Sequence, residues 1–404
     1  MKVILIQPDG MADEPVAQLG NKTPLQAAYT PSMDWLASAG LLGTVHSIPA
    51  GFPPGSDIGN LVLMGHDPNK VFTGRAPLEA AAQGISTTPQ DVIYRVNFVH
   101  IDQGVMVDFT AGHISNEEAA ELISALNQEL GIAGLRLYPG VSYRNLGVWH
   151  QGAMPTQAEP PHNLTDKPIE GFDARPDSVR AVMDKARDIL ARHPVNHKRV
   201  AAGKKAATHI WMWGEGRMPT LRSIGDMYGW SHGTMITAVD LLRGIARLSG
   251  VDVVDVEGAT GFIDTNYEGK AQAALDALDK SDLVFVHIEA PDESAHMGRS
   301  DYKLKSIEDT DAKIVAPLLR AARQRGDTAI VLLPDHPTLI RTKTHSADPV
   351  PCLVAYPEHL RRDVRGDERA YSESTQPVDF ELPAGWELLQ RVQARTLART
   401  QAAA

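Results

Sequence analysis

The stretch VLLPDHPTLIRTKTH, residues 331–345, decides the fold class of this chain. It begins inside the apolar run Ala329–Leu333, whose β-branched residues are typical of a buried strand in a parallel sheet. Asp335 and His336 follow directly, and His345 closes the stretch. Because open α/β sheets bind ligands beyond the carboxyl ends of their strands, this acid and these imidazoles are candidate metal ligands. The competing interpretation is a turn with a capping aspartate and two surface histidines.

Two other strand patterns end in the same residue types. Residues 2–7, KVILIQ, are followed by Asp9 in the segment PDGMAD, for which a type I turn is the competing interpretation. Residues 282–288, DLVFVHI, are followed by Asp292 and His296, whose spacing places both on one face of a helical turn. Turns and helix caps alone do not readily explain acids at three strand ends of one sheet. The ligand-type residues divide into two groups, each with a carboxylate and an imidazole, and predict a two-metal site.

Ser56 follows the turn sequence FPPG and opens a predicted helix at 57–64. The simplest interpretation is an N-cap. The positive end of a helix also suits a nucleophile that accepts a phosphoryl group, and a nearby metal lowers the pKa of such a hydroxyl. Ser56 is therefore a candidate nucleophile beside the two metals. Mixed Asp and His ligands favour Mn²⁺ or Zn²⁺ over Ca²⁺, with Mg²⁺ and Co²⁺ as alternatives.

A block of different character, roughly residues 88–170, interrupts the pattern of buried parallel strands. We expect residues 1–87 and 171–404 to form a metal-binding α/β/α domain around a mostly parallel sheet, and 88–170 to form a smaller inserted α+β domain. Within the insertion, the sequence predicts one helix, at 116–129. It also predicts short strands at 94–101, 105–109, 135–138 and 143–149. In the larger domain it predicts helices at 233–248 and 302–324.

The composition limits the partners of the chain. Its 404 residues carry a formal net charge of -11, which argues against a nucleic-acid-binding protein. The single cysteine, Cys352, permits no internal disulfide and suits the reducing cytoplasm. No stretch approaches the roughly 20 apolar residues of a membrane helix, and the apolar run at the start is too short for a signal peptide. We expect a cytoplasmic protein with a small-molecule substrate.

Five ordered segments resemble the cofactor-independent phosphoglycerate mutases of the archaeal type, within the alkaline-phosphatase superfamily. They are PDGMAD at 8–13, PGSDIGNLVLMGHDP at 54–68, GRAPLEA at 74–80, HIEAPDESAHMG at 287–298 and PDHPTLIRTKTHSADPVP at 334–351. The resemblance implies an alkaline-phosphatase-like fold and a glycolytic isomerase that interconverts 3-phosphoglycerate and 2-phosphoglycerate through a phosphoserine at Ser56. It also implies the ligand sets of the two metals: Asp292, His296 and His345 for one, and Asp9, Asp335, His336 and the Ser56 oxygen for the other.

The same resemblance extends to the substrate. It implies anion binding by Arg75, Arg95 and Arg144, although a structural ion pair is the competing interpretation for each. Asp102 or Asp108 would move a proton between the hydroxyls of the substrate. Two further polar residues of the insertion are expected near the substrate: Asn97 and His113.

Two segments depart from the family pattern. The sequence DFTAGHI at 108–114 replaces a run of arginines, and WSH at 230–232 replaces a stretch where a basic residue is expected. Both departures fall in segments that are expected to bind substrate or phosphate. They make the chain similar to a sub-branch of the family that has been proposed to act as homoserine kinase. A homoserine kinase-like phosphotransferase and a metal-dependent phosphatase are therefore the alternative functions.

Overall fold

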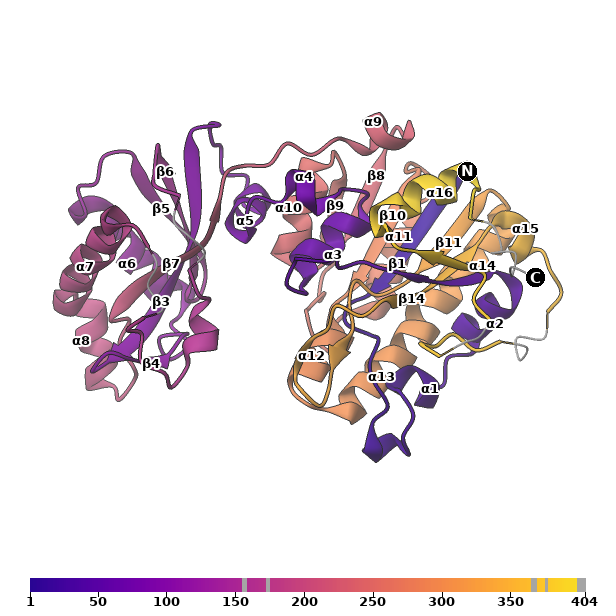
Figure 1. Ribbon diagram of the computed structural model, residues 1–404, viewed down its shortest axis with the longest axis horizontal. Helices are drawn as coiled ribbons and strands as arrows, with labels where there is room; N and C mark the ends of the chain where they lie inside the picture. The colour runs from indigo at the N-terminus through magenta and orange to yellow at the C-terminus, as the bar shows by residue number, and fades with distance from the viewer. Residues whose placement is uncertain (155–157, 172–174, 365–368, 375–376, 398–404) are drawn as a thin grey trace. The chain divides into compact units, whose positions relative to one another are not determined.

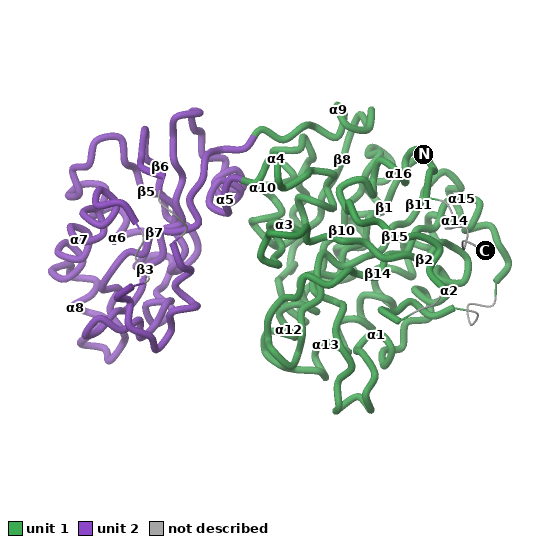
Figure 2. Tube along the Cα trace, viewed as in Figure 1, with its two compact units in different colours: residues 1–72, 220–404 green, residues 73–219 purple. Residues whose placement is uncertain are grey.

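The computed structural model describes residues 1–154, 158–171, 175–364, 369–374 and 377–397 of the chain. They divide into two units: unit 1 comprises residues 1–72 and 220–404, and unit 2 comprises residues 73–219 (Figures 1 and 2). Unit 2 is wider than the predicted insertion at 88–170, because elements on both sides of that interval pack on its sheet. These elements are α5 (Arg75–Ala82), α7 (Asp177–Arg192), α8 (Pro194–Ala201) and β7 (His209–Gly216).

An eight-stranded sheet forms the centre of unit 1, in the order β15-β2-β14-β11-β1-β10-β8-β9. Its strands are β1 (Lys2–Pro8), β2 (Leu41–Val45), β8 (Gly233–Ile236), β9 (Asp252–Val254), β10 (Leu283–Ile288), β11 (Thr328–Leu332), β14 (Val350–Ala355) and β15 (Phe380–Leu382). β1 pairs in parallel with both β10 and β11, whereas β14 runs antiparallel to its two neighbours. The predicted, mostly parallel sheet is therefore confirmed.

Helices cover both faces of this sheet (Figure 1). Ile4 and Ile6 of β1 belong to a buried apolar cluster with residues of α2, α11, α13 and α14. Val3 and Leu5 point to the opposite face by strand alternation and are also fully buried. The unit thus has the predicted three-layer α/β/α architecture. Its helices are α1 (Pro24–Ala27), α2 (Pro31–Ala39), α3 (Ser56–Leu63), α4 (Pro68–Val71), α9 (Ile224–Tyr228), α10 (Asp240–Leu248), α11 (Tyr267–Ala277), α12 (Ala290–His296), α13 (Ser300–Thr310), α14 (Ala316–Arg325), α15 (Pro357–Leu360) and α16 (Leu388–Ala394).

The helix predicted at 233–248 is wrong in its first part. Residues 233–236 form strand β8, and helix α10 begins at Asp240. The sequence GTMI at the start of this interval is buried between the parallel neighbours β10 and β9, so pairing decides its conformation. A short apolar run of this kind carries too few residues for its periodicity to distinguish strand from helix.

The long helix predicted at 302–324 is present, with one irregular turn. α13 and α14 are joined without a break by a π-helical turn, Asp311–Val315. This turn places the Asp311 carboxylate at the start of α2, where it accepts hydrogen bonds from the backbone N–H of Ser32 (3.2 Å) and Met33 (2.7 Å). Within the described residues, no helix is long and apolar enough to cross a membrane.

Unit 2 is built on an antiparallel sheet of five strands. Its central strand β3 pairs with β6 on one side and with β7 on the other, so Arg95 lies between Leu146 and Trp213. The helix predicted at 116–129 is α6 (Asn116–Glu129), and the predicted strands are β3 (Asp91–Asp102), β4 (Val105–Asp108), β5 (Leu135–Val141) and β6 (Arg144–His150). The core of the unit lies between this sheet and the helices α6 and α7.

Candidate metal and nucleophile site

Ser56 is the first residue of α3, and Gly55 takes the N-cap position. The N-cap interpretation of Ser56 is therefore wrong. The Ser56 hydroxyl instead lies 3.2 Å from Nε2 of His336. The backbone carbonyl of Ser56 accepts a hydrogen bond from the Asn60 side chain. The hydroxyl stands at the positive end of a helix and beside an imidazole, which is a suitable environment for a nucleophile.

Asp9, Asp335 and His336 come together at the carboxyl ends of two neighbouring strands. β1 and β11 are parallel partners, so the loops that follow them meet at one edge of the sheet. Nε2 of His336 lies 3.3 Å from Asp335 Oδ2 and 3.8 Å from Asp9 Oδ1, and all three side chains are fully buried. Asp335 is held from outside the group by the Gly10 N–H (3.3 Å) and the Asn60 amide (3.1 Å).

Asp292, His296 and His345 form a second group beside the first. Asp292 and His296 lie on α12, directly after β10, and His345 lies in a short hairpin formed by β12 (Thr338–Leu339) and β13 (Thr344–His345). Asp292 Oδ2 is 3.1 Å from His296 Nε2, and Asp292 Oδ1 is 3.4 Å from His345 Nε2. The ligand atoms of these three residues all lie within 4.8 Å of one another, and so do those of Asp9, Asp292 and His336.

The two histidines of the second group are oriented to bind a cation. Nδ1 of His296 is bonded to the Lys343 carbonyl (2.9 Å), and Nδ1 of His345 to the Pro54 carbonyl (3.3 Å). Since a carbonyl can only accept, both Nδ1 atoms carry a proton, and Nε2 of each ring is directed at the site. The two Nε2 atoms lie 2.9 Å apart, and two lone pairs at that distance require a proton or a metal ion between them.

The carboxylates of the site also require positive charge. Burial raises the pKa of Asp9 well above its usual value, and the neighbouring charges of Asp335, Glu289 and Asp292 raise it further. The buried Oδ1 of Asp9 has no hydrogen-bond partner among the described residues. At Asp292, burial also raises the pKa, but contacts with His296 and other imidazoles outweigh burial and lower it well below its usual value. An unpartnered buried oxygen within a set of Asp and His donors fits a divalent metal ion.

The pKa of His296 responds to the same carboxylate. Burial lowers this pKa, but the hydrogen bond and charge of Asp292 outweigh burial and raise it to about 9. At the first group, burial lowers the pKa of His336, which leaves that ring neutral and able to bind a metal.

The sequence analysis missed two residues of this region, His287 and Glu289. Nε2 of His287 lies 2.9 Å from Asp9 Oδ2 and 3.1 Å from Glu289 Oε2, and the ring is fully buried. These three residues form a further group whose ligand atoms lie within 4.8 Å of one another. The available signal was a polar residue inside the buried strand pattern LVFVHI, which pairs beside β1.

In unit 2, the three arginines expected to bind anions gather around one carboxylate, that of Glu79 in α5. Arg75 Nε lies 3.1 Å from Glu79 Oε1, and Arg95 Nε lies 2.9 Å from Glu79 Oε2. Burial raises the pKa of Glu79, but the charges of Arg95, Arg75 and Arg144 outweigh burial and lower it. Three guanidinium groups around one carboxylate leave a net positive charge, which suits a carboxylate or phosphate ligand.

Arg95 and Asn97 are ordered by a common neighbour, Trp213. The guanidinium of Arg95 stacks on the Trp213 ring at 4.3 Å from its centre, and the indole N–H donates to Asn97 Oδ1 at 3.2 Å. Burial lowers the pKa of Arg95 to about 10, so this side chain stays charged at neutral pH. The predicted substrate residues Arg75, Arg95, Asn97 and Arg144 thus form one region of unit 2.

The other predicted residues of unit 2 are not brought into this region. Asp102 is exposed at the end of β3, seven residues from Arg95, which corresponds to roughly 23 Å along a strand. His113 is exposed, with φ of 50°, after the end of β4. The distance along β3 therefore separates Asp102 from the arginines.

Asp108 is engaged in local contacts. Its Oδ2 lies 2.9 Å from Lys205 Nζ, and its Oδ1 accepts hydrogen bonds from the N–H and hydroxyl of Thr110. Burial raises the pKa of Asp108, but the bonds from Thr110 and Lys205 outweigh burial and lower it to about 2. In this arrangement Asp108 is an ionised carboxylate of low basicity.

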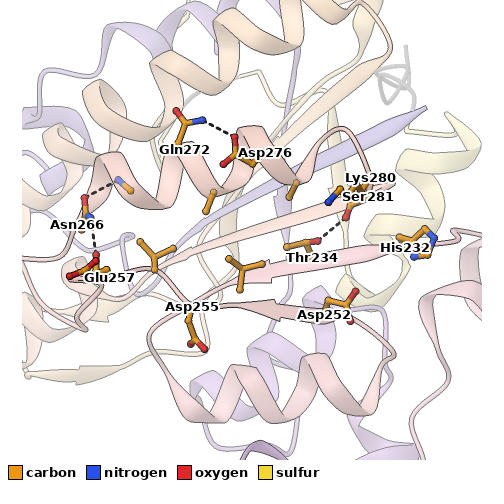
Figure 3. A pocket seen from close by; sticks show the side chains of 15 residues that line it. His232, Thr234, Asp252, Asp255, Glu257, Asn266, Gln272, Asp276, Lys280 and Ser281 are labelled. Carbon is orange, nitrogen blue, oxygen red and sulfur yellow. Dashed lines mark hydrogen bonds between the residues drawn. The ribbon is translucent and has the colours of Figure 1, made fainter.

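A cavity of about 890 Å³ lies elsewhere in unit 1, between β8, β9 and α11 (Figure 3). Its lining includes acids such as Asp252, Asp255 and Asp276, together with Lys280. None of the candidate metal ligands lines it. Cavity size therefore does not locate the site, whereas the convergence of ligand atoms does.

Comparisons with known proteins show which family this chain resembles in sequence. A family model described as 2,3-bisphosphoglycerate-independent phosphoglycerate mutase matches residues 37–196. A protein of that name from Methanosarcina barkeri is 47% identical over 359 residues, which cover 88% of this chain and 90% of the relative. This chain belongs to that family. A relative from Geobacter sulfurreducens, named a probable mutase of the same kind, is 46% identical over 361 residues, with coverage of 88% and 90%.

Solved structures of similar proteins match this chain over nearly its full length. A cofactor-independent phosphoglycerate mutase from Thermoplasma acidophilum is 28% identical, covers 97% of this chain and 100% of its own, and gives a TM-score of 0.63. A protein from Pyrococcus horikoshii is 27% identical, covers 98% and 97%, and gives a TM-score of 0.79. Membership of this mutase family implies dependence on divalent metal, and the donor set described above fits such ions.

Proposed function

We propose that this chain interconverts 3-phosphoglycerate and 2-phosphoglycerate through a phosphoserine at Ser56. The observation that carries the proposal is the position of the Ser56 hydroxyl, 3.2 Å from His336 Nε2 and at the edge of two groups of metal-ligand side chains. The family name of the relatives supports an isomerase over a homoserine kinase. The proposed reaction requires no nucleotide, since the phosphoryl group that Ser56 takes from the glycerate returns to the same glycerate.

Two divalent ions, Mn²⁺ or Zn²⁺ with Mg²⁺ or Co²⁺ as alternatives, complete the proposed site. One set of ligands is Asp292, His296 and His345, and the other is Asp9, Asp335, His336 and Ser56 Oγ. When bound, such ions polarise phosphoryl oxygens and lower the pKa of a nearby hydroxyl. The oxygen and nitrogen donors suit these metals.

Ser56 carries the phosphoryl group in the proposed reaction. Its Oγ attacks phosphorus, the bond between phosphorus and the glycerate oxygen breaks, and the Ser56 proton passes to that oxygen, which becomes a free hydroxyl. The second glycerate hydroxyl then attacks the phosphoserine, which returns the phosphoryl group and frees Ser56. The N-terminus of α3 stabilises the added negative charge, because Ser56 is the first residue of that helix and stands at the positive end of its dipole. Of the two proton carriers expected from the resemblance, Asp102 lies roughly 23 Å along β3 from Arg95 and Asp108 is an ionised carboxylate of low basicity, so we propose neither for this step.

Unit 2 supplies the proposed substrate-binding groups. Arg75, Arg95 and Arg144 would hold the carboxylate or phosphate of the glycerate, and Glu79 keeps two of these guanidinium groups aligned. Asn97 would add a hydrogen bond, and His113 remains a proposed contact. Because a phosphoserine exposed to water hydrolyses, we propose that this unit acts as the substrate-binding lid.

The test is an assay with 3-phosphoglycerate as the sole substrate. The metal-loaded protein is incubated with it, and 2-phosphoglycerate and free phosphate are followed over time. Formation of 2-phosphoglycerate without phosphate is expected. Phosphate alone would identify a phosphatase. No product from 3-phosphoglycerate, but turnover in a separate reaction with ATP and homoserine, would identify a kinase. Ser56→Ala should remove the activity while both ions stay bound, because Asp9, Asp335 and His336 remain as ligands of the second ion.

A further inference from the structure

Thr338 joins the two groups of candidate ligands through a single hydroxyl. Its Oγ1 lies 2.5 Å from Asp292 Oδ1 and 3.2 Å from His336 Nδ1. Asp292 belongs to one group and His336 to the other. The Thr338 side chain is fully buried, so water does not compete for these bonds. The hydroxyl is thus placed to influence both groups at once.

The chemistry of the three groups fixes the direction of these hydrogen bonds. Asp292 contacts two imidazoles and is ionised, so it can only accept, and the Thr338 hydroxyl donates to it. That hydroxyl has one hydrogen, so toward His336 it can only accept. Nδ1 of His336 must therefore carry a proton, and the Nε2 lone pair points to Ser56 Oγ.

The backbone of Thr338 is anchored on both sides. Its carbonyl accepts a hydrogen bond from Lys303 Nζ at 2.7 Å, and its N–H donates to the Ala12 carbonyl at 3.1 Å. Lys303 is itself fully buried and also contacts Asp13 Oδ2 at 2.8 Å. These contacts tie the hairpin that carries Thr338 to the loop that carries Asp9. The position of the hydroxyl is therefore set by the fold.

Gly10 leaves the space that the Thr338–Asp292 bond occupies. A Cβ atom at Gly10 would lie 2.4 Å from Thr338 Oγ1 and 2.6 Å from Asp292 Oδ1. Gly10 also has φ of 58°, in the region that favours glycine. The close approach of the Asp9 loop to this bond is therefore possible because residue 10 has no side chain.

We propose that Thr338 is a positioning residue, which holds His336 as the Nδ1–H tautomer and couples it to Asp292. With Nδ1 protonated, His336 offers Nε2 to a metal ion beside Ser56. The same hydroxyl orients one carboxylate oxygen of Asp292 in the other group. The inference rests on the metal ligands of the proposed function, because positioning matters only if His336 and Asp292 bind metal. Outer groups of this kind typically change metal affinity about 10- to 100-fold.

The first test measures the tautomer in the metal-free, full-length protein. Nitrogen NMR of protein labelled with ¹⁵N-histidine distinguishes a protonated from an unprotonated ring nitrogen, and His336→Gln assigns the signals. The expected result is a protonated Nδ1 and a bare Nε2 on His336. A proton found on Nε2 in the wild-type protein would overturn the inference. This readout needs neither substrate nor metal, so it is independent of whether the chain is a mutase.

The second test compares Thr338→Val, which removes the hydroxyl, with Thr338→Ser, which keeps it. Titration calorimetry with Mn²⁺ or Zn²⁺ alone gives the affinity of each site. Thr338→Val should bind about 10- to 100-fold more weakly at both sites and mix the His336 tautomers, whereas Thr338→Ser should stay close to wild type. Unchanged affinity in Thr338→Val, or a loss confined to one site, would contradict the coupling. If Thr338→Val does not fold, the wild-type tautomer alone decides the question.

Discussion

The Oγ of Ser56 lies 3.2 Å from Nε2 of His336, although 280 residues separate them in the chain. The N-terminus of α3 reaches the loop after β11 because residue 59 is a glycine. A Cβ atom at Gly59 would lie 2.9 Å from both the Cβ and the carbonyl oxygen of Asp335. Any larger residue would push the helix, and with it Ser56, away from the loop that carries His336. The site thus depends on backbone contact as well as on the ligand side chains.

Removal of the Asp292 carboxylate should empty one of the two metal sites. In Asp292→Asn the side chain keeps its shape but loses the charge that holds His296 and His345. We expect metal analysis to show a stoichiometry near one ion per chain, against two in the wild type. Asp301→Asn, at an exposed carboxylate on α13, is the matched control and should keep both ions. Two ions bound with unchanged affinity in Asp292→Asn would exclude this residue as a ligand.

Replacement of Arg95 by lysine should weaken substrate binding without affecting the metals. Lysine keeps the charge but cannot both bond Glu79 and stack on Trp213 as a planar group does. The loss of one charge-assisted contact is worth about 1.5–3 kcal/mol, or roughly 10- to 150-fold in kcat/KM. Steady-state kinetics with 3-phosphoglycerate measure this, with Arg136→Lys as the control in the same unit. Equal values of kcat/KM in Arg95→Lys and Arg136→Lys would exclude Arg95 as a substrate-binding residue.

The buried Lys303 should contribute strongly to stability. It makes contacts of 2.8 Å with Asp13 Oδ2 and 2.7 Å with the Thr338 carbonyl, and both charged side chains are fully buried. Lys303→Met leaves Asp13 as a buried carboxylate without its cation, which costs about 3–5 kcal/mol. Lys305→Met, two positions along the same helix, breaks an exposed pair with Asp309 and should cost less than about 1 kcal/mol. Denaturant unfolding of both variants should reveal this difference, and similar losses would contradict it.

Stability should fall between neutral pH and pH 5 because of His66. Burial lowers the pKa of this side chain to about 4, from about 6.5 in an unfolded chain. Between these two values the unfolded state binds a proton that the folded state does not, so the stability present above pH 6.5 is lost as the pH falls. The expected loss from pH 7 to pH 5 is about 2 kcal/mol. The free energy of unfolding should be measured at both pH values for the metal-free wild type and for His66→Gln. Its change between pH 7 and pH 5 should be smaller in the variant, and equal changes would rule out His66 as the cause.

The sequence predicts that the three aspartates proposed as metal ligands lie close together, because each of them follows a recognisable buried strand. Asp9, Asp292 and Asp335 stand directly after β1, β10 and β11, and these three strands are neighbours in the sheet. Parallel pairing brings such strand ends to one edge whatever the intervening sequence is. The convergence of residues far apart in the chain could therefore be inferred without coordinates.

Other features depend on packing that a sequence pattern does not contain. The segment 233–236 is a strand because it is buried between two other strands, which its short apolar run does not reveal. The cap position of α3 falls on Gly55 rather than Ser56, a difference of one residue that changes the role of the hydroxyl. The bonds of Thr338 likewise arise from a tertiary contact between a hairpin and two loops.

The most direct test of the proposed reaction is the detection of phosphoserine at residue 56. The metal-loaded wild-type protein is mixed with 3-phosphoglycerate, quenched in acid during turnover, digested and examined by peptide mass spectrometry. We expect one phosphoryl group on Ser56 in part of the chains, and none in Ser56→Ala. Formation of 2-phosphoglycerate with Ser56 unmodified, or with the phosphoryl group on another residue, would contradict it.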